Sequence, residues 1–407
     1  MGGRQLTLAL WTLAILSLGT SLVPILDGEQ GYDTVPLWNA VRALLEGGDV
    51  YTARGSGDFL YPPSALLLLL PLGFLGLPWA GRTFFFVDLL AILAAAALLL
   101  DLFGLRWRGV TGALAVLVLS LTWPVLLTLE AGNANGPILL GLAGFIYAAS
   151  RSSWVLAGVS LGFALALKPV LAPLILILVL YRRWDALAPA IGIPAGLSAV
   201  VMLVSPETRE YLDITVPLLF EGQNASVQRN SIALESVLDR FAVPYAIAQG
   251  LKVAVLAATI ALVWRRWRRD DAEPRRLVEI VSLVLVGAFL LSSFAFVHYG
   301  VFLIPLAVSL ADPSSPHRNW LMFGALFVVA AREAWQLDLL PDDVNRVLIE
   351  RFTFGLLLML VAFWLALRDE PKKPSQLRRR WRRIRGSELS IAELASGKAV
   401  HRDARTR

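Results

Sequence analysis

The sequence predicts an all-α, polytopic integral membrane protein, and three observations lead to this fold class. Of the 407 residues, 57% are hydrophobic and 17% are charged, with a mean hydropathy of +0.65. A typical soluble domain is about 25% charged, so one water-soluble core cannot hide this much apolar surface. Roughly twelve apolar runs have the length of membrane helices or of parts of them, and Lys and Arg cluster between the runs. An ordinary cytosolic enzyme, a disordered protein and a nucleic-acid-binding domain are excluded.

The first apolar run, residues 6–26, has no small-residue cleavage site before the polar stretch that follows, so we expect a retained signal anchor. Further runs are expected at 83–105, 109–129, 136–150, 154–167, 169–181, 186–204, 246–264, 277–297, 299–311, 320–338 and 350–367. The short ones are typical of tilted or broken helices that line a cavity. Residues 64–77 are apolar but contain Pro71, and we expect a re-entrant or interfacial helix on the outer side. The alternative is that they span the membrane while 154–181 form one long helix.

Basic clusters predict the orientation, because cytoplasmic loops carry an excess of Lys and Arg. These clusters are Arg106 and Arg108, Arg151, Arg182 and Arg183, residues 265–276, and Arg318. With an even number of spans, both termini lie in the cytoplasm, and residues 27–63 and 205–244 form outer loops of one membrane domain, residues 1–367. Residues 368–407 hold 13 Lys or Arg against 5 Asp or Glu, which predicts a disordered, basic cytoplasmic tail attracted to anionic lipid.

The composition also limits the chemistry of the site. Cysteine is absent, which excludes disulfides, thiolate metal sites and thiol nucleophiles. The three histidines are too few for a His-rich metal centre. Neither a thiolate metal site nor a His-rich metal centre is therefore expected.

Asp33 is the first candidate for a catalytic role. Leu37, Val41, Leu44 and Leu45 follow it at helical spacing and predict an amphipathic helix lying in the membrane interface. Asp33 stands just before the first turn of this helix, where a carboxylate either caps the helix or serves as a general base at the membrane surface.

Lys168 is the second candidate, because it is the only charged residue between Trp154 and Tyr181. An intramembrane lysine is costly unless it is paired, and Pro169 interrupts the helix directly after it. One interpretation is a cation that binds a phosphate, and the other is a lysine that snorkels to the headgroups.

His298 follows an apolar run and falls on the outer side of the predicted topology. It either forms a structural hydrogen bond or belongs to the same site as Asp33 and Lys168. The segment from Glu130 to Pro137 contains Asn133 and Asn135, which favour either a turn or amide hydrogen bonds to sugar hydroxyls. The remaining candidates for substrate binding are polar or aromatic residues of the outer side: Tyr61, Asn224, Arg229, Asn230 and Tyr299.

These residues lie in motifs that resemble glycosyltransferase family 87. The motifs are Asp-x-x-x-Leu-Trp, Gly-Gly-Asp-Val-Tyr, Leu-Tyr-Pro-Pro before a leucine run, Asn-Ala-Asn-Gly, Ala-Leu-Lys-Pro followed by Tyr-Arg-Arg-Trp, Gln-Asn-Ala-Ser with a later Arg-Asn-Ser, and Val-His-Tyr with a later Ile-Pro-Leu. Each motif is short, but their order from about residue 30 to about residue 310 is fairly specific.

The resemblance implies a GT-C fold with its site at the outer face, and a polyprenyl-monophosphate sugar as donor. It implies that Asp33, Lys168 and His298 are the catalytic residues. Because a lipid-linked donor carries no nucleotide, it also implies that no cofactor is required, although a divalent ion is left open. At residues 133–136 the chain has Asn-Ala-Asn-Gly where the family's mannosyltransferases more usually have Gly-Gln-x-Asn. The resemblance therefore leaves arabinofuranosyl and mannosyl donors both open.

We accordingly expect an inverting glycosyltransferase of the plasma membrane, with a polyprenyl-phosphate sugar, a cell-envelope glycan or glycolipid acceptor and the bilayer as partners, and no nucleic acid. The alternatives are a secondary transporter or exporter of a lipid-linked or small polar substrate, and a non-catalytic component of polymer export. A transporter would more often show internal repeats, and we find no clear repeat.

Overall fold

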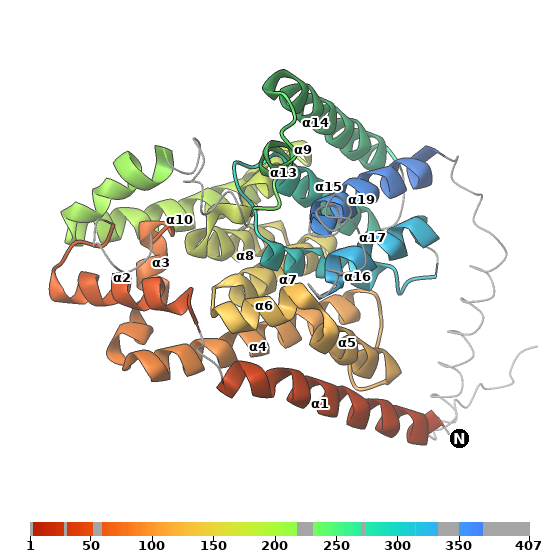
Figure 1. The fold of residues 1–407 in the computed structure, drawn as a ribbon, viewed down its shortest axis with the longest axis horizontal. Helices are drawn as coiled ribbons and strands as arrows, with labels where there is room; N and C mark the ends of the chain where they lie inside the picture. Colours follow the sequence, from red (N-terminus) through yellow and green to blue (C-terminus); the bar gives the residue numbers. More distant parts are fainter. Residues whose placement is uncertain are drawn as a thin grey trace, which may run out of the picture.

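The computed structural model describes residues 3–27, 31–51, 59–217, 231–269, 273–313, 315–332 and 350–368. All regular elements of this part of the chain are helices (Figure 1). The predicted all-α class is therefore confirmed for the described residues. The basic tail and residues 218–230 of the second predicted outer loop lie outside them.

Five helices are long and apolar enough to cross a membrane: α1 (Gly3–Asp27), α4 (Leu77–Leu102), α10 (Trp184–Val204), α14 (Tyr245–Trp267) and α19 (Arg351–Arg368). A sixth span results if α5 (Val110–Leu121) and α6 (Trp123–Ala131) are counted together, although they meet at 64°. A proline cannot donate the backbone bond that continues a helix, and Pro124 in the first turn of α6 accounts for this break. The expected count of about twelve spans thus stays a prediction.

The remaining apolar runs form shorter helices. They are α7 (Asn135–Ser150), α8 (Trp154–Leu167), η2 (Pro169–Leu174), α9 (Ile175–Leu180), α15 (Arg275–Leu291), η5 (Val297–Leu303), α16 (Ile304–Ser309) and α17 (Trp320–Ala330). Residues 63–74 form α3 (Pro63–Leu69) and η1 (Leu70–Phe74), which together are too short to span and agree with a re-entrant or interfacial element.

The two predicted outer loops contribute α2 (Thr34–Glu46), η3 (Pro206–Arg209), the π-helical η4 (Tyr211–Thr215) and α13 (Leu234–Arg240). In α2 the buried positions are Thr34, Leu37, Ala40 and Val41, which lie on one helix face. The predicted amphipathic helix is therefore confirmed.

The long helices differ in how much of their apolar surface the protein covers. Only 6% of the span in α1, 11% in α10 and 17% in α14 is buried, compared with 50% in α4 and in α19. Apolar side chains left open in this way need a hydrocarbon solvent, so α1, α10 and α14 form the lipid-facing surface. The helices pack in pairs. α4 packs on α7, α7 on α8 and α8 on α10, while α1 packs on α5, α14 on α15 and α17 on α19 (Figure 1).

The segment from α8 to α9 doubles back on itself at Lys168. The ring centroids of Trp154, at the start of α8, and Tyr181, directly after α9, lie 5.4 Å apart. The two arms therefore start and end at the same level, and Lys168 occupies the tip between them. This break excludes the alternative in which residues 154–181 form one long helix.

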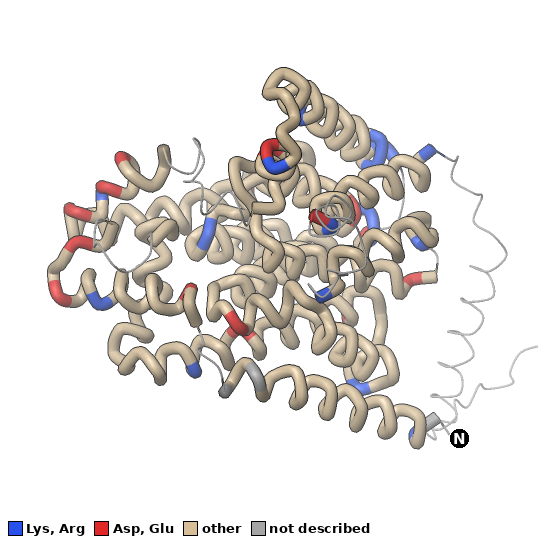
Figure 2. The backbone as a smooth tube through the Cα atoms, in the orientation of Figure 1, with Lys and Arg blue, Asp and Glu red and all other residues tan. Residues whose placement is uncertain are grey.

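The basic clusters come together at one end of the molecule. Arg276 forms an ion pair with Glu273 at 2.7 Å and lies 5.9 Å from the ring of Tyr181. Arg183 lies 4.8 Å from the ring of Trp154, at the start of the neighbouring arm. We call this region the basic end. Figure 2 shows that Lys and Arg concentrate at the side where α1 begins and α14 and α19 end, whereas Asp and Glu concentrate near α2 and the end of α10.

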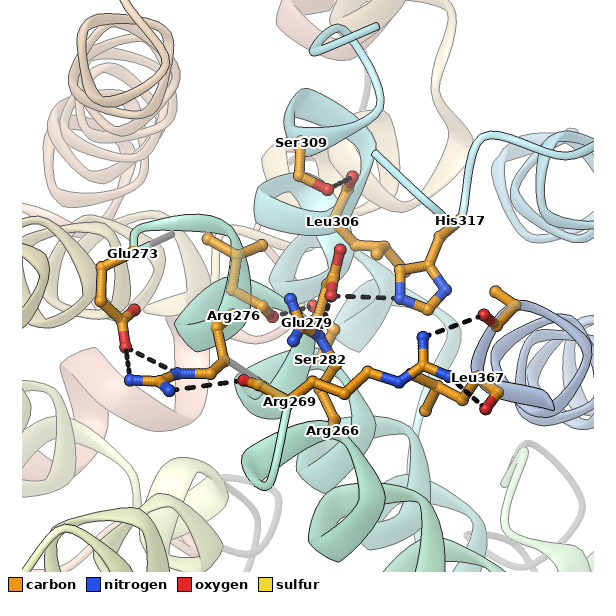
Figure 3. Close-up of polar contacts among 12 residues, drawn as sticks. Arg266, Arg269, Glu273, Arg276, Glu279, Ser282, Leu306, Ser309, His317 and Leu367 are labelled. Atoms are coloured by element: carbon orange, nitrogen blue, oxygen red, sulfur yellow. Dashed lines mark hydrogen bonds and ion pairs between the residues drawn. The ribbon is translucent and has the colours of Figure 1, made fainter. Parts of the chain in front are cut away.

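A buried ionic cluster ties the helices together at the basic end (Figure 3). Arg266 of α14 and Glu279 of α15 are ion-paired with both side chains 0% exposed, and His317 Nε2 lies 3.1 Å from Glu279. Arg269 donates to the backbone carbonyl of Leu367 in α19. Charged groups removed from water in this way need partners, and here the partners come from neighbouring helices.

Candidate functional site

A cavity of about 680 Å³ lies at the opposite end of the bundle from the basic end. Its position follows from α8 and α15, because both helices begin at the basic end and reach the cavity at Lys168 and Ser292. Polar and charged side chains from segments far apart in the sequence line it: Tyr32, Asp33, Tyr61, Lys168, Ser231, Arg240, Ser292, Ser293, His298, Tyr299 and Glu350. The volume falls in the range of small-molecule sites, about 300–1,000 Å³.

The backbone around Asp33 is fixed against the loop that follows α6. The N–H of Asp33 donates to the carbonyl of Ala131 at 2.9 Å, and Thr34 Oγ1 donates to the carbonyl of Gly132 at 2.7 Å. Gly132 has a φ of +62°, and a Cβ there would lie 2.2 Å from Thr34 Oγ1. Glycine is therefore required at residue 132 both for its left-handed backbone and for this close approach.

The Asp33 side chain does not cap α2, although Asp33 occupies the N-cap position. Instead its Oδ2 accepts a hydrogen bond from Asn133 Nδ2 at 3.3 Å. Burial raises the pKa of Asp33 above its ordinary value, while the nearby Lys168 charge and the Asn133 hydrogen bond oppose this effect. A raised pKa brings a carboxyl group closer to the range in which a general base works well at neutral pH.

Lys168 reaches the cavity because of the proline that follows it. A residue before proline avoids the helical conformation, and Lys168 has φ −157° and ψ 131°, which ends α8. Its Nζ lies 5.0 Å from the ring centroid of Tyr61 and 4.9 Å from that of Tyr299. Within the described residues no carboxylate forms an ion pair with Lys168, so the two aromatic rings hold the ammonium beside the cavity.

His298 lines the same cavity and is 8% exposed. Its ring stacks on Phe296 with centroids 5.3 Å apart, and it meets the ring of Tyr299 edge-on at 4.9 Å. Nε2 is buried and has no hydrogen-bond partner among the residues that the structure describes. Buried polar atoms are nearly always paired, so this nitrogen is available to a ligand.

Tyr61 and Tyr299, both predicted to bind substrate, also line the cavity. Burial raises the pKa of Tyr61 to about 12, so its phenol stays a neutral hydrogen-bonding group at physiological pH.

The other predicted binding residues are placed differently. Asn133 and Asn135 are fully buried and do not line the cavity. Asn133 Oδ1 accepts from the N–H of Asn135 at 3.1 Å, so turn chemistry and the bond to Asp33 account for its side chain. Asn224, Arg229 and Asn230 lie outside the described residues.

Two charged residues of the cavity wall, Arg240 and Glu350, were missed by the sequence reasoning. Arg240 lies near the end of the predicted outer loop 205–244, and Glu350 is the first residue of the expected span 350–367, so a charge beside a predicted outer boundary is the signal that could have identified them. Within the described residues, no group of three His, Cys, Asp or Glu side chains is placed to hold a metal ion.

The comparisons with known proteins come from sequence alone, because no solved structure matches the chain. Residues 59–293 match glycosyltransferase family 87. An alpha-(1->3)-arabinofuranosyltransferase of Mycolicibacterium smegmatis is 30% identical over 88% of this chain and 84% of its own length. The enzymes of the same name from Corynebacterium glutamicum and Mycobacterium tuberculosis are 30% and 27% identical to this chain. The matched regions cover 86% and 84% of the lengths of these two enzymes. The chain therefore belongs to glycosyltransferase family 87.

Proposed function

We propose that this glycosyltransferase moves an arabinofuranosyl residue from a polyprenyl-monophosphate donor to a hydroxyl group of a cell-envelope glycan or glycolipid. The observation that carries the proposal is the placement of Asp33, Lys168 and His298 in one cavity. The names of the relatives favour the arabinofuranosyl group over the mannosyl group as the sugar transferred.

In the proposed reaction Asp33 takes the proton of the acceptor hydroxyl as that oxygen attacks the anomeric carbon. The bond between this carbon and the phosphate oxygen breaks, and its electron pair leaves with the phosphate. A placed general base contributes about 10²–10⁴-fold to such a step. Because a single displacement is involved, the anomeric centre inverts.

Lys168 stabilises the charge that develops on the leaving phosphate, and His298 Nε2 bonds a phosphate oxygen or a sugar hydroxyl. Such preorganised electrostatic stabilisation is often the largest catalytic contribution. The apolar part of the wall, which includes Leu127, Val170 and Phe289, suits the first isoprene units of the donor. A lipid monophosphate donor brings no nucleotide diphosphate, so the mechanism as drawn calls for no cofactor.

The proposal places the protein in the plasma membrane as a GT-C enzyme, with both termini and the basic end in the cytoplasm and the cavity at the outer face. The excess of Lys and Arg at the basic end supports this orientation, since positive residues favour the cytoplasmic side.

The test is to incubate the purified protein with a glycan acceptor and either radiolabelled polyprenyl-phosphoarabinose or polyprenyl-phosphomannose. We expect a new glycoside from the arabinose donor, with the anomeric configuration opposite to that of the donor. The Asp33→Asn variant serves as the matched negative control. No glycoside with either donor, or a retained configuration, would overturn the proposal.

A further inference from the structure

A second charged pair lies in the cavity wall in addition to Asp33 and Lys168. Arg240, the last residue of α13, donates from Nε and Nη2 to the two carboxylate oxygens of Glu350, at 2.5 and 2.6 Å. Nη2 also donates to the backbone carbonyl of Ser231 at 2.8 Å. Arg240 and Glu350 both line the cavity, and their side chains are 23% and 7% exposed. The catalytic step described above uses neither of them.

A purely structural role would not require this pair to face a cavity. The chain contains a structural pair of the same residue types, Arg266 and Glu279, with both side chains 0% exposed in the interior of the basic end. Neither of those two residues lines the cavity. The position of the Arg240–Glu350 pair therefore calls for an explanation beyond the link that it forms between α13 and the start of α19.

The cavity region around Lys168 carries a positive charge, whereas the region around Arg240 and Glu350 is neutral overall. The two regions therefore suit different ligands. Lys168 is held by aromatic rings and forms no ion pair within the described residues, so its positive charge is available to an anion. The charge of Arg240 is neutralised by Glu350. A neutral, strongly polar pair is suited to uncharged hydroxyl groups, and it offers little attraction to a phosphate.

The pair also has hydrogen-bonding capacity left. A carboxylate offers about four acceptor sites, and the two hydrogen bonds from Arg240 occupy one on each oxygen of Glu350. Neighbouring sugar hydroxyls can donate to the remaining sites. Phe294 and Phe296 belong to the same wall and provide apolar surface for a sugar ring.

From these observations we infer that Arg240 and Glu350 form the acceptor subsite, in which Glu350 accepts hydrogen bonds from neutral sugar hydroxyls of the acceptor glycan. This inference rests on the proposed function. It divides the cavity into a donor region at Lys168 and an acceptor region at Glu350, with Asp33 taking the proton that moves when the two substrates react.

The first experiment measures the acceptor KM and the donor Kd of Glu350→Gln, with a synthetic arabinofuranosyl trisaccharide as acceptor and polyprenyl-phosphoarabinose as donor. Hydrogen bonds to charged groups account for roughly 10–100-fold in binding, so we expect the acceptor KM to rise about tenfold or more. The donor Kd should stay within about twofold of the wild-type value, since Lys168 is unchanged.

Two further variants keep the result interpretable. Glu350→Gln removes the negative charge that faces Arg240. The double variant Arg240→Gln/Glu350→Gln therefore replaces the ion pair with two neutral side chains, and it should show the same rise in acceptor KM. The control is Glu279→Gln, which weakens the comparable pair at the basic end and should leave the acceptor KM of the folded protein unchanged.

Acceptors that each lack one hydroxyl group identify the contact directly. Removing a hydroxyl that bonds Glu350 should raise the acceptor KM of the wild type. The same removal should change the acceptor KM of Glu350→Gln much less. An unchanged acceptor KM in a folded double variant, or a rise in donor Kd instead, would overturn the inference. If the wild-type protein makes no glycoside at all, it is the proposed function that fails.

Discussion

The carboxylate of Asp88 accepts a hydrogen bond from the backbone N–H of Gly136 at 2.9 Å and so joins α4 to the first turn of α7. Asp88 is fully buried, and a Cβ on Gly136 would lie 2.5 Å from its Oδ1. Three residues before Gly136, Asn133 bonds the carboxylate of Asp33. The turn from residue 132 to residue 136 is thus fixed from two directions, by Asp88 inside the bundle and by Asp33 at the cavity.

Asp88→Leu should lower the thermal stability of the protein. The substitution leaves the N–H of Gly136 buried without an acceptor, which costs about 1–3 kcal/mol. Asp88→Asn keeps an acceptor oxygen at the same place and is the matched control. The measurement is the thermal unfolding temperature of both variants in the same detergent. Equal stability of the Leu variant and the wild type would show that the bond to Gly136 contributes nothing.

Asp33→Asn should reduce the transfer rate by at least about 100-fold while leaving donor binding intact. It should also stabilise the fold. Burial raises the pKa of Asp33, so the native state holds this proton more tightly than the unfolded chain does. Ionisation of Asp33 as pH rises through that raised pKa therefore costs folding stability, and a neutral Asn avoids the cost.

Transfer rate and unfolding temperature at neutral pH test both parts of the Asp33 prediction. The control is Asp49→Asn in the same loop, because Asp49 bonds the backbone of Tyr51 and does not line the cavity. More than about a tenth of the wild-type rate in Asp33→Asn would exclude Asp33 as the general base.

Asn133→Leu should shift the acid limb of the pH profile of kcat/KM to higher pH. The hydrogen bond from Asn133 lowers the pKa of Asp33, so its loss lets burial raise that pKa further. A base must be ionised to act, and more alkaline conditions are then needed. Asn135→Leu is the control, since its side-chain amide has no partner among the described residues. If the acid limb of the Asn133→Leu profile stays where it is in the wild type, Asn133 does not affect the ionisation of the catalytic base.

Lys168→Met should weaken donor binding and slow the chemical step together, because the phosphate gains charge as its bond to the sugar breaks. Lys168→Arg should keep part of both properties, since the charge remains while the geometry changes. Donor affinity and single-turnover rate of folded variants provide the measurement. Wild-type values for both in Lys168→Met would remove Lys168 from the site.

Sequence patterns predicted the parts of the site that depend on local chemistry. The spacing of apolar residues identified α2, and the Lys168–Pro169 pair identified the break that carries the ammonium to the cavity. The sequence could not show that the Asp33 side chain leaves the helix uncapped, because that side chain bonds Asn133, which is 100 residues away. The same applies to Arg240 and Glu350, whose separation of 110 residues hides their contact.

Asp88 was not among the residues predicted to have a role, although the sequence shows it as a carboxylate within the apolar run 83–105. Such an intramembrane charge is by itself a reason to expect a role. The prediction of the number of membrane spans was limited for a different reason, namely that hydropathy does not locate breaks within an apolar run. Hydropathy locates apolar runs, but breaks such as those at Pro124 and Pro169 decide whether a run crosses the bilayer or turns back.

The wall of the cavity draws on residues from Tyr32 to Glu350, and this order has a consequence for biosynthesis. A chain leaving the ribosome carries Asp33 and Lys168 long before it carries Glu350. Until residue 350 has been made, the cavity lacks the Glu350 carboxylate and the ion pair that this carboxylate forms with Arg240. The site therefore becomes complete only when the chain has been made as far as Glu350, and no shorter nascent chain contains all of its lining residues.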